Sequence, residues 1–311
     1  MRCRRRADNL DAMPFRAIVI DKVARRAAKP ESLHKSWNPA TERQQQSFTK
    51  FAASLPAHRT EVVNELAAGY RDRVMRGSGF LAIWSDLRAE DETDWAHWMT
   101  REHAIERVRV EGFLACRIFR ALGTTTNRYF ILYDLERPDV VGGAEYLARL
   151  EAPTPWSQRI MPRLRNFARG GGRVIASAGI GQGGLMAAIR FDTQPEWEAD
   201  ALCRELASMD RVATARVMLT DLVQTSIQTR EKSMRSKDST FAGLLVIEGL
   251  DQMSMRNALW RLPSLAPQLN RRLIEELPLY AICFNLDRRL LPRRLSSSWS
   301  SDSTPGILPG A

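Results

Sequence analysis

Glu102 and His103 are the residues of this chain whose types and placement best suit proton transfer. They lie in the segment from Trp95 to Phe113, in which apolar residues recur at helical spacing. On a helical wheel, Glu102 falls within the apolar face and His103 at its margin. Because imidazole titrates near neutral pH, a carboxylate and a histidine that line a pocket under the helix could exchange protons with a ligand. We therefore predict that His103 and Glu102 are the catalytic residues of one pocket.

The same segment also admits a structural interpretation. In it, Glu102 and Glu106 pair with Arg101, Arg109 or another basic group, and His103 only caps a cleft. On the functional interpretation, neighbouring side chains supply the walls of the pocket or a phenolic donor. The predicted ligand-binding residues are Trp98, Glu106, Tyr129, Tyr133, Tyr146 and Trp156. For the aromatic residues among them, packing in the core is the alternative role.

We expect neither a metal nor a cofactor. His97 and His103 are six residues apart and so lie on different faces of a helix, whereas zinc-ligand pairs on a helix share a face. A haem with His103 as axial ligand is the alternative left open. Gly179 to Gly184 matches the GxGxxG pattern, but the strand-like run Leu185 to Phe191 follows it where a dinucleotide site needs a helix. The glycines therefore predict a flexible connection.

The elements that would position these residues follow the order βαββαβ from Gly79 onward. Apolar runs predict strands at 80–84, 113–120, 129–133 and 173–177, with a helix from Trp95 to Gly112 and another from about Ala144 towards Met161. The order recurs about 105 residues later, with strands at 185–191, 212–219, 241–247 and 279–285, a helix opened by Pro195 and a helix over 253–262. Residues 170–172 are predicted to be a turn, and the polar residues 221–239 a long loop inside a hairpin.

This repeated order predicts an α+β fold of two ferredoxin-like βαββαβ units, 79–181 and 182–287. Each unit would form a four-stranded antiparallel sheet with both helices on one face, which leaves the other face apolar and uncovered. Two such sheets can cover each other. We therefore predict tandem ferredoxin-like units that form an intrachain pseudo-dimeric α/β barrel. The chain would be a monomer with this pseudo-dimer inside it, or a homodimer.

Three strings resemble the EthD-like proteins of the dimeric α/β-barrel superfamily: WxxREHxxER followed by a GF strand, RYFILYDL, and YLxRLxxPTPW. The resemblance covers about residues 79–179 and extends to 183–286 only in element order. It implies a pocket between sheet and helices in each unit, and it places the Glu-His pair of the family at Glu102 and His103. The first helix of the second unit has Arg204 and Glu205 but no histidine, so we expect one competent pocket, in the first unit.

In that superfamily, related pockets serve cofactor-free monooxygenation, isomerisation, cyclisation or dehydration, and haem chemistry. The resemblance thus favours a cofactor-free lyase, isomerase or cyclase that acts on a small aromatic or polyketide-like molecule. One alternative is a non-catalytic module that binds a small apolar or aromatic molecule or that takes part in a stress response. Another is contact with nucleic acid through a basic N-terminal extension. Whether the chain is an enzyme, and on which substrate, is left open by its residues.

The positive charge of the chain is concentrated near its start. Residues 1–78 hold 16 Lys or Arg and 8 Asp or Glu, which is +8 of the net +10. They lack a sustained apolar period, so we predict a poorly ordered extension there, and a disordered tail at 288–311. Translation beginning at Met75 would remove most of that extension. Because the remainder is almost neutral, a nucleic-acid partner is not the preferred expectation. No apolar run approaches 18 residues, so we expect a cytoplasmic protein without a membrane partner.

Overall fold

The computed structural model describes residues 77–124, 127–193, 195, 198–235, 238–269 and 274–292. The predicted extension at 1–78 lies outside the described residues except for Gly77 and Ser78. Of the predicted tail, only residues 288–292 are described.

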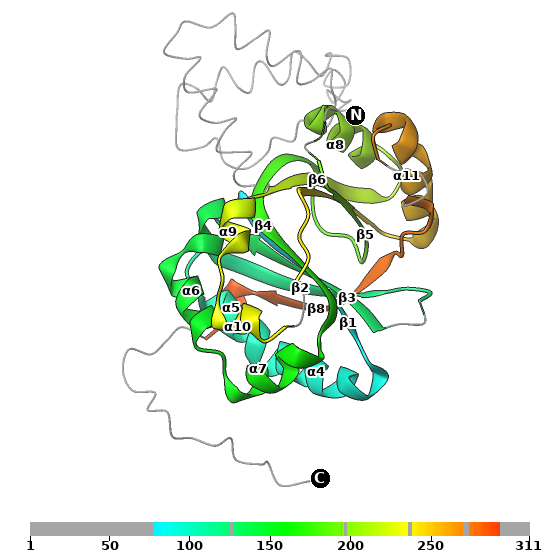
Figure 1. The fold of residues 1–311 in the computed structure, drawn as a ribbon. Coiled ribbons are helices and arrows are strands. Elements are labelled where there is room, and N and C mark those ends of the chain that lie inside the picture. Colours follow the sequence, from blue (N-terminus) through cyan, green and yellow to red (C-terminus); the bar gives the residue numbers. More distant parts are fainter. Residues whose placement is uncertain are drawn as a thin grey trace, which may run out of the picture. The chain divides into compact units, whose positions relative to one another are not determined.

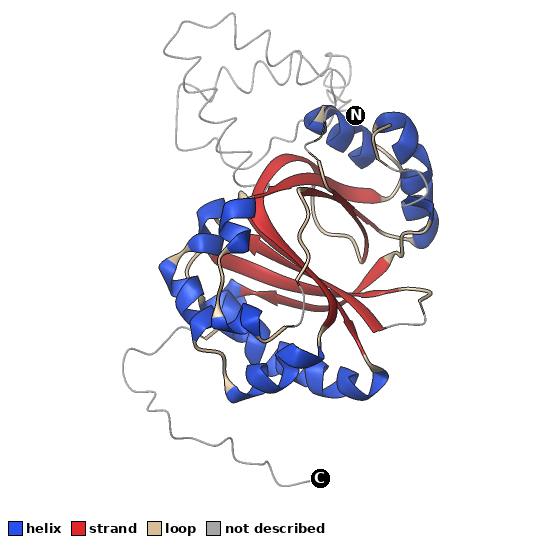
Figure 2. Ribbon diagram, in the orientation of Figure 1, coloured by secondary structure: helices blue, strands red, loops and turns tan. Residues whose placement is uncertain are grey.

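The strands of the described residues form a closed antiparallel barrel (Figures 1 and 2). Their bounds are β1 (Gly79–Leu87), β2 (Phe113–Ala121), β3 (Asn127–Leu135), β4 (Arg165–Gly179), β5 (Leu185–Phe191), β6 (Val212–Thr220), β7 (Gly243–Gly249) and β8 (Tyr280–Asp287). Around the barrel the order is β1-β3-β2-β8-β5-β7-β6-β4, and β4 pairs with β1 to close it. The predicted closed barrel in a mixed α/β protein is therefore confirmed.

The helices lie outside the barrel (Figure 2). Their bounds are α4 (Glu92–Trp98), α5 (Ala104–Arg109), α6 (Ala144–Glu151), α7 (Pro155–Ile160), α8 (Ala199–Ala207), α9 (Leu222–Ser226), α10 (Arg230–Ser233) and α11 (Gln252–Leu265). A π-helical turn, Met99–His103, joins α4 to α5. Across the described ranges, no helix has the length and apolar character that crossing a membrane would need.

The two halves of the barrel, β1 to β4 and β5 to β8, have the same strand order. Within the first half the order is β4-β1-β3-β2, and within the second it is β8-β5-β7-β6. Two seams join the halves, β2 with β8 and β4 with β6. Helices α4 to α7 belong to the first half, and α8 and α11 to the second.

Alternating side chains on the strands build separate cores inside and outside the barrel. On β1, Phe80, Ala82 and Trp84 point into the barrel and join one buried cluster, while Leu81 packs with the helices of the first half. A third buried cluster lies between the strands and helices of the second half and includes Leu245. Sheets buried on both faces explain why these strands are apolar almost throughout.

The glycine run 170–172 is not the predicted turn, because it lies inside β4, which is 15 residues long. A Cβ atom on Gly170 would lie 2.5 Å from the ring of Phe241, and one on Gly172 would lie 2.2 Å from the carbonyl oxygen of Leu219. The glycines are needed because neighbouring chain passes too close for a side chain.

The glycine-rich segment Gly179–Gly184 joins β4 to β5, as predicted. Gly179 and Gly181 have φ values of +86° and +92°, which glycine adopts without steric cost. The strand β5 begins directly after it, at Leu185.

The polar segment between β6 and β7, residues 221–242, is hereafter called the insert. The predicted loop is instead partly helical, because α9 and α10 lie within it. Both helices begin at a side-chain cap: Asp221 accepts the backbone N–H of Gln224, and Thr229 accepts that of Lys232. Figure 1 shows α9 and α10, in yellow, beside the helices of the first half. A segment of the second half thus covers part of the first.

The ordered chain extends past the predicted boundary at residue 287. Residues Arg288–Leu290 form a 3-10 turn. Arg288 Nη1 donates to the carbonyl oxygens of Val108, Val110 and Phe113, and its distance to the first is 3.1 Å. These bonds tie the 3-10 turn to the end of α5 and to the start of β2.

Candidate functional site

The π-helical turn Met99–His103 determines where the predicted catalytic histidine lies. A π turn adds about one residue to a helical turn, so side chains after it rotate relative to a regular helix. His103, at the end of this turn, is 5% exposed rather than marginal. Its ring stacks on Trp98, with ring centroids 4.1 Å apart and planes inclined by 33°. The helix therefore directs the imidazole inward, against the sheet.

His103 contributes to a cavity between the outer face of the first half's sheet, its helices and the insert, which we call the His103 cavity. Its volume is about 30 Å³, enough for one or two water molecules. The lining residues are Leu81, Ile83, His103, Arg107, Tyr133, Val141, Tyr146, Leu147, Leu150, Phe167, Arg169, Gln224, Ile227, Thr229, Glu231, Lys232 and Arg235. Aliphatic and aromatic walls come mainly from the first half, whereas the insert supplies mainly polar groups.

His103 is held in its neutral form. Burial lowers its pKa well below the ordinary 6.5, and the positive charges of Arg107 and Arg235 lower it further. In the part of the chain that the structure describes, Nδ1 of His103 is buried and has no hydrogen-bond partner. The hydroxyl of Tyr133, on the same cavity, is also buried and lies beside the thiol of Cys116, and burial raises its pKa well above 10.0. The cavity thus combines a potential proton acceptor with a protonated phenol.

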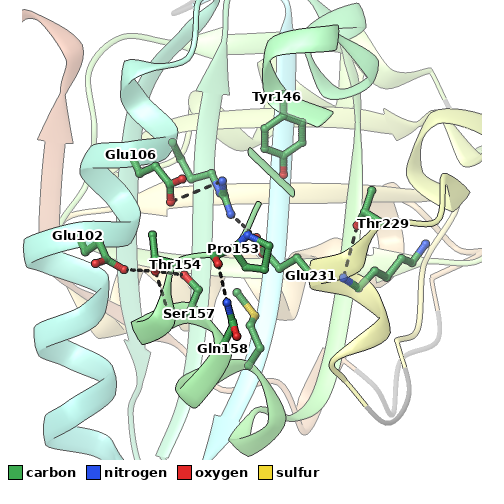
Figure 3. Close-up of polar contacts among 12 residues, drawn as sticks. Glu102, Glu106, Tyr146, Pro153, Thr154, Ser157, Gln158, Thr229 and Glu231 are labelled. Atoms are coloured by element: carbon green, nitrogen blue, oxygen red, sulfur yellow. Dashed lines mark hydrogen bonds and ion pairs between the residues drawn. The ribbon is translucent and has the colours of Figure 1, made fainter. Parts of the chain in front are cut away.

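Arg107 and Glu231 form a buried ion pair that connects α5 to the insert. Their side chains are 2% and 7% exposed, and Arg107 Nη2 donates to Glu231 Oε2. Glu106 Oε2 lies 3.7 Å from Arg107 Nη1, and both carboxylates appear in Figure 3. Burial disfavours the charge on Arg107, but Glu231 together with Tyr146 and Glu106 more than offsets this, and the pKa of the guanidinium is raised. Arg107 therefore remains charged next to the neutral imidazole.

Arg169 and Lys232 both donate to the backbone carbonyl oxygen of Thr225, at 3.4 Å and 3.1 Å. Arg169 also donates to the hydroxyl of Tyr146, at 3.3 Å. Within the described ranges, no carboxylate lies within 4.0 Å of either cation. Burial, and then the charge of Arg169, lowers the pKa of Lys232. These two cations lack the pairing that Arg107 has.

A fourth cation on the cavity, Arg235, has its own partner. Its Nε and Nη2 donate to the two oxygens of Asp238, at 2.8 Å and 2.6 Å. The guanidinium also lies over the ring of Phe167, 4.1 Å from the centroid. The ion pair fixes Arg235 within the insert, and the contact with Phe167 holds this end of the insert against β4.

The structure brings three of the residues singled out in the sequence together on the His103 cavity. They are His103, Tyr133 and Tyr146. The hydroxyl of Tyr146 accepts a hydrogen bond from Arg169, and its ring lies 5.7 Å from the guanidinium of Arg107. An imidazole and two phenols thus share one small space.

Glu102 does not meet His103 on this cavity. Its Oε1 accepts a hydrogen bond of 2.6 Å from the Thr154 hydroxyl, which also caps α7 (Figure 3). Glu106 is beside Arg107 at the edge of the site and is not a lining residue. Adjacent positions in a helix point in different directions, so Glu102 and His103 serve different surroundings.

The other singled-out aromatic residues have partners elsewhere. Trp98 is 1% exposed and its Nε1 donates to the hydroxyl of Ser157 at 3.2 Å. Tyr129 donates to Glu92 and stacks on Trp95. Trp156 Nε1 donates to Asp94 Oδ1 at 2.9 Å. None of these three lines the cavity.

The insert and β4 supply site residues that the sequence did not single out: Arg169, Glu231, Lys232 and Arg235. The length and polarity of residues 221–239 were the available signal, because a hairpin needs only a few residues to turn. Which surface such a segment covers depends on how the two halves of the barrel pair. A short stretch of sequence does not reveal that pairing.

A second cavity, of about 200 Å³, lies at one end of the barrel interior and is lined in part by a charged network. Arg216 donates to Asp134 Oδ1 at 2.9 Å and to Glu248 Oε1 at 3.0 Å. Arg117, which is fully buried, donates to Glu248 Oε2 at 2.8 Å. The network joins β2, β3, β6 and β7, and its charges balance. We interpret it as structural, because each charge has an opposite charge as its partner.

The second half, residues 182–287, contains no histidine to match His103. Arg204 and Glu205 are both exposed on α8. Glu205 lies 3.6 Å from Arg261, and both side chains are about half exposed. The space between these helices and the sheet is filled by the apolar cluster of the second half.

No family model matches the chain, and no curated protein matches it. Among solved structures, an anthrone oxidase-like protein is 12% identical, with a TM-score of 0.44 over 68% of this chain and 94% of its own. A proposed monooxygenase from Fusobacterium nucleatum subsp. nucleatum is 11% identical, with a TM-score of 0.39 over 68% and 96%. One from Lactobacillus acidophilus is 6% identical, with a TM-score of 0.40 over 68% and 97%. Similarities of this size do not identify an activity for this chain.

Proposed function

We propose that this protein is a cofactor-free enzyme of lyase, isomerase or cyclase type, with His103 as its general base. The observation that carries this proposal is the buried, neutral imidazole whose Nδ1 has no partner among the described residues. In the tautomer with the proton on Nε2, Nδ1 is an acceptor. It removes a proton from an acidic C–H or O–H group of a bound molecule and returns it to another atom of that molecule.

Two neighbouring groups support this chemistry. Removal of a proton leaves an anion, and the guanidinium of Arg107 supplies a fixed positive charge beside the base. The Tyr133 hydroxyl stays protonated, and it donates a hydrogen bond to a developing oxyanion after turning from the Cys116 thiol beside it. The apolar walls suit a small aromatic or polyketide-like molecule.

Substrate entry on this proposal requires the insert to move. The cavity of about 30 Å³ is far smaller than an aromatic substrate. The sheet and the buried Trp98 make one side rigid, whereas α9 and α10 are short helices of five and four residues. Because the buried Arg107–Glu231 pair holds the insert to α5, the pocket enlarges only when this contact is broken.

The fold supports a related proposal, that the two halves are tandem ferredoxin-like units akin to EthD-like proteins. In both halves the strands lie in the order fourth, first, third, second. Equivalent positions of the halves also carry equivalent charges, Arg117 on β2 and Arg216 on β6, and Asp134 on β3 and Glu248 on β7. Such correspondence is what duplication of one unit would leave.

The test compares His103→Gln with His97→Gln, which changes an exposed histidine of the same helix. The full chain is incubated with a panel of enolisable aromatic ketones and hydroxyquinoid compounds, and turnover and solvent deuterium exchange are measured. For any compound that the wild type turns over, His103→Gln should lower the turnover rate about 10²- to 10⁴-fold. His97→Gln should leave that rate unchanged. Equal turnover of the wild type and His103→Gln would refute His103 as the base.

A non-catalytic binding module is the second candidate, favoured by the ion pair between Arg107 and Glu231, which would close the insert over a captured molecule. Native mass spectrometry of the purified chain would then show a retained small molecule that is released unchanged. The nucleic-acid alternative falls on residues 1–78, which lie outside the described part except for 77 and 78. Salt-sensitive retention on an RNA column that disappears on removal of 1–75 would support it.

A further inference from the structure

We infer that the His103 cavity selects small organic carboxylates, and that Arg169 and Lys232 form the subsite that holds the carboxylate group. The inference rests on the function proposed above, because it names the substrate class of that same cavity. It concerns which molecules the cavity accepts and which residues recognise them.

The charges on the cavity are unequal. Four cations line it, Arg107, Arg169, Lys232 and Arg235, against one lining carboxylate, Glu231. Glu231 is bound to Arg107, and Arg235 is held by Asp238, just outside the lining. The positive charge that is not balanced at short range is therefore located on Arg169 and Lys232.

These two cations converge on one neutral oxygen. The Thr225 carbonyl accepts from Arg169 Nη1 at 3.4 Å and from Lys232 Nζ at 3.1 Å. Two like charges that share one uncharged acceptor repel each other, and burial of Arg169, which is 9% exposed, reduces screening by water. An anion placed between them would replace this repulsion with two charge-assisted hydrogen bonds.

The rest of the cavity indicates what the carboxylate would be attached to. Leu81, Ile83 and Phe167 line the wall of the sheet, which favours an aromatic or branched aliphatic body. His103 is neutral on the same cavity, so it neither competes with the two cations for the carboxylate nor repels an apolar body. An aromatic monocarboxylate satisfies both regions, in a cavity that movement of the insert must first enlarge from about 30 Å³.

The experiment compares benzoate with benzamide, a neutral molecule of nearly the same shape. Binding to the full chain is measured by isothermal titration calorimetry in low-salt buffer at pH 7. Benzoate should bind at least about 10-fold more tightly than benzamide, the ratio that loss of one charge-assisted hydrogen bond gives. Competition by inorganic phosphate distinguishes a general anion site from one that also needs an apolar body, for which phosphate would compete poorly.

Variants identify the subsite. Arg169→Gln and Lys232→Gln should each weaken benzoate binding about 10-fold or more and leave benzamide binding unchanged. Arg173→Gln, an exposed position on the same strand as Arg169, is the matched control and should change neither. Because Lys232 is only partly buried, its variant should keep the fold even if Arg169→Gln does not, and circular dichroism checks both.

Two failures have different meanings. If benzamide binds as tightly as benzoate and a bulky substitution in the cavity wall, Leu81→Trp, abolishes both, the cavity binds small molecules without selecting anions. The carboxylate inference is then wrong, and the proposed function stands. If benzoate binding is unaffected by Arg169→Gln, Lys232→Gln and Leu81→Trp, the ligand is bound elsewhere and the inference is overturned. If neither molecule binds and no compound of the panel is turned over, the proposed function fails with it.

Discussion

At the scale of single residues, burial of a neutral histidine couples stability to pH. The pKa of His103 in the folded protein lies well below 6.5, its ordinary value, because of burial and the charges of Arg107 and Arg235. Between the folded pKa and about 6.5 the unfolded chain binds a proton that the folded chain does not. The free energy of unfolding should therefore fall as the pH falls through this window, by up to about 1.4 kcal/mol per pH unit. Above about pH 6.5 neither state binds this proton, and the loss of stability is absent.

His103→Gln should remove that dependence. The slope of the unfolding free energy against pH, measured by urea denaturation between pH 5 and 7, should become shallower. The decrease should be up to about 1.4 kcal/mol per pH unit, which corresponds to one proton. The exposed His97→Gln in the same helix is the control and should keep the wild-type slope. The groups that share the cavity with His103, including Glu231 and Tyr133, are unchanged in both variants. An identical slope for all three proteins would show that His103 titrates normally when folded.

The Arg107–Glu231 pair allows a second prediction at this scale. Glu231→Gln leaves a guanidinium that is 2% exposed without its nearest carboxylate, so unfolding free energy should fall by about 3–5 kcal/mol. Glu205→Gln, in a half-exposed pair with Arg261, should cost less than about 1 kcal/mol. Chemical denaturation of both variants measures the difference. Similar small losses would mean that the insert does not depend on this pair.

At the scale of elements, the close approach of β4 to β6 depends on glycine. A Cβ at position 172 would lie 2.2 Å from the carbonyl oxygen of Leu219, a backbone atom that cannot move without separating the strands. Gly172→Ala should therefore destabilise the protein by about 1–3 kcal/mol. Gly184→Ala is the matched control, because no atom lies within 4 Å of its Cβ position; its effect should stay within about 0.5 kcal/mol. Equal thermal stability of the two variants would contradict this account of β4.

Element type and order could be predicted from the sequence because they depend on local periodicity. Each predicted strand has a counterpart, from β1 to β8. The helix predicted to open at Pro195 is α8, which begins instead at Ala199. The glycine run in β4 was misassigned because glycine marks both turns and close contacts, and only the neighbouring β6 and Phe241 show which applies.

The site was less accessible from the sequence, for two physical reasons. The wheel assumes 100° per residue, whereas the π turn Met99–His103 changes that angle, so His103 is buried and Glu102 bonds to Thr154 instead. The insert brings Glu231 and Lys232 to the cavity. It lies beside the first half only because the barrel closes through the pairing of β4 with β6. Neither effect has a signature in a short window of sequence.

At the scale of the whole barrel, each half depends on the other for its edge strands. In residues 79–181 alone, β2 would lose its pairing with β8 and β4 its pairing with β6. The interior face that carries Phe80, Phe119 and Phe130 would also become exposed. Unpaired edges and exposed apolar faces promote association.

We therefore expect the fragment 79–181 to aggregate or to form a homodimer, whereas residues 77–292 should remain folded. Size-exclusion chromatography with light scattering gives the mass of each, and thermal denaturation monitored by circular dichroism reports folding. A stable monomer of the fragment, with a cooperative transition, would show that one half needs no cover and would contradict the tandem-unit proposal.

The charged network inside the barrel bears on how such a homodimer would differ from the present chain. Each half contributes one guanidinium and one carboxylate: Arg117 and Asp134 from the first, Arg216 and Glu248 from the second. Two copies of the first half would again place two of each in the interior, so self-pairing would preserve its neutrality. Self-pairing would not supply Glu231, which only the second half carries. A symmetric homodimeric ancestor would thus have had a barrel with balanced interior charges. Glu231, the carboxylate that lines the His103 cavity, requires two halves whose sequences can differ.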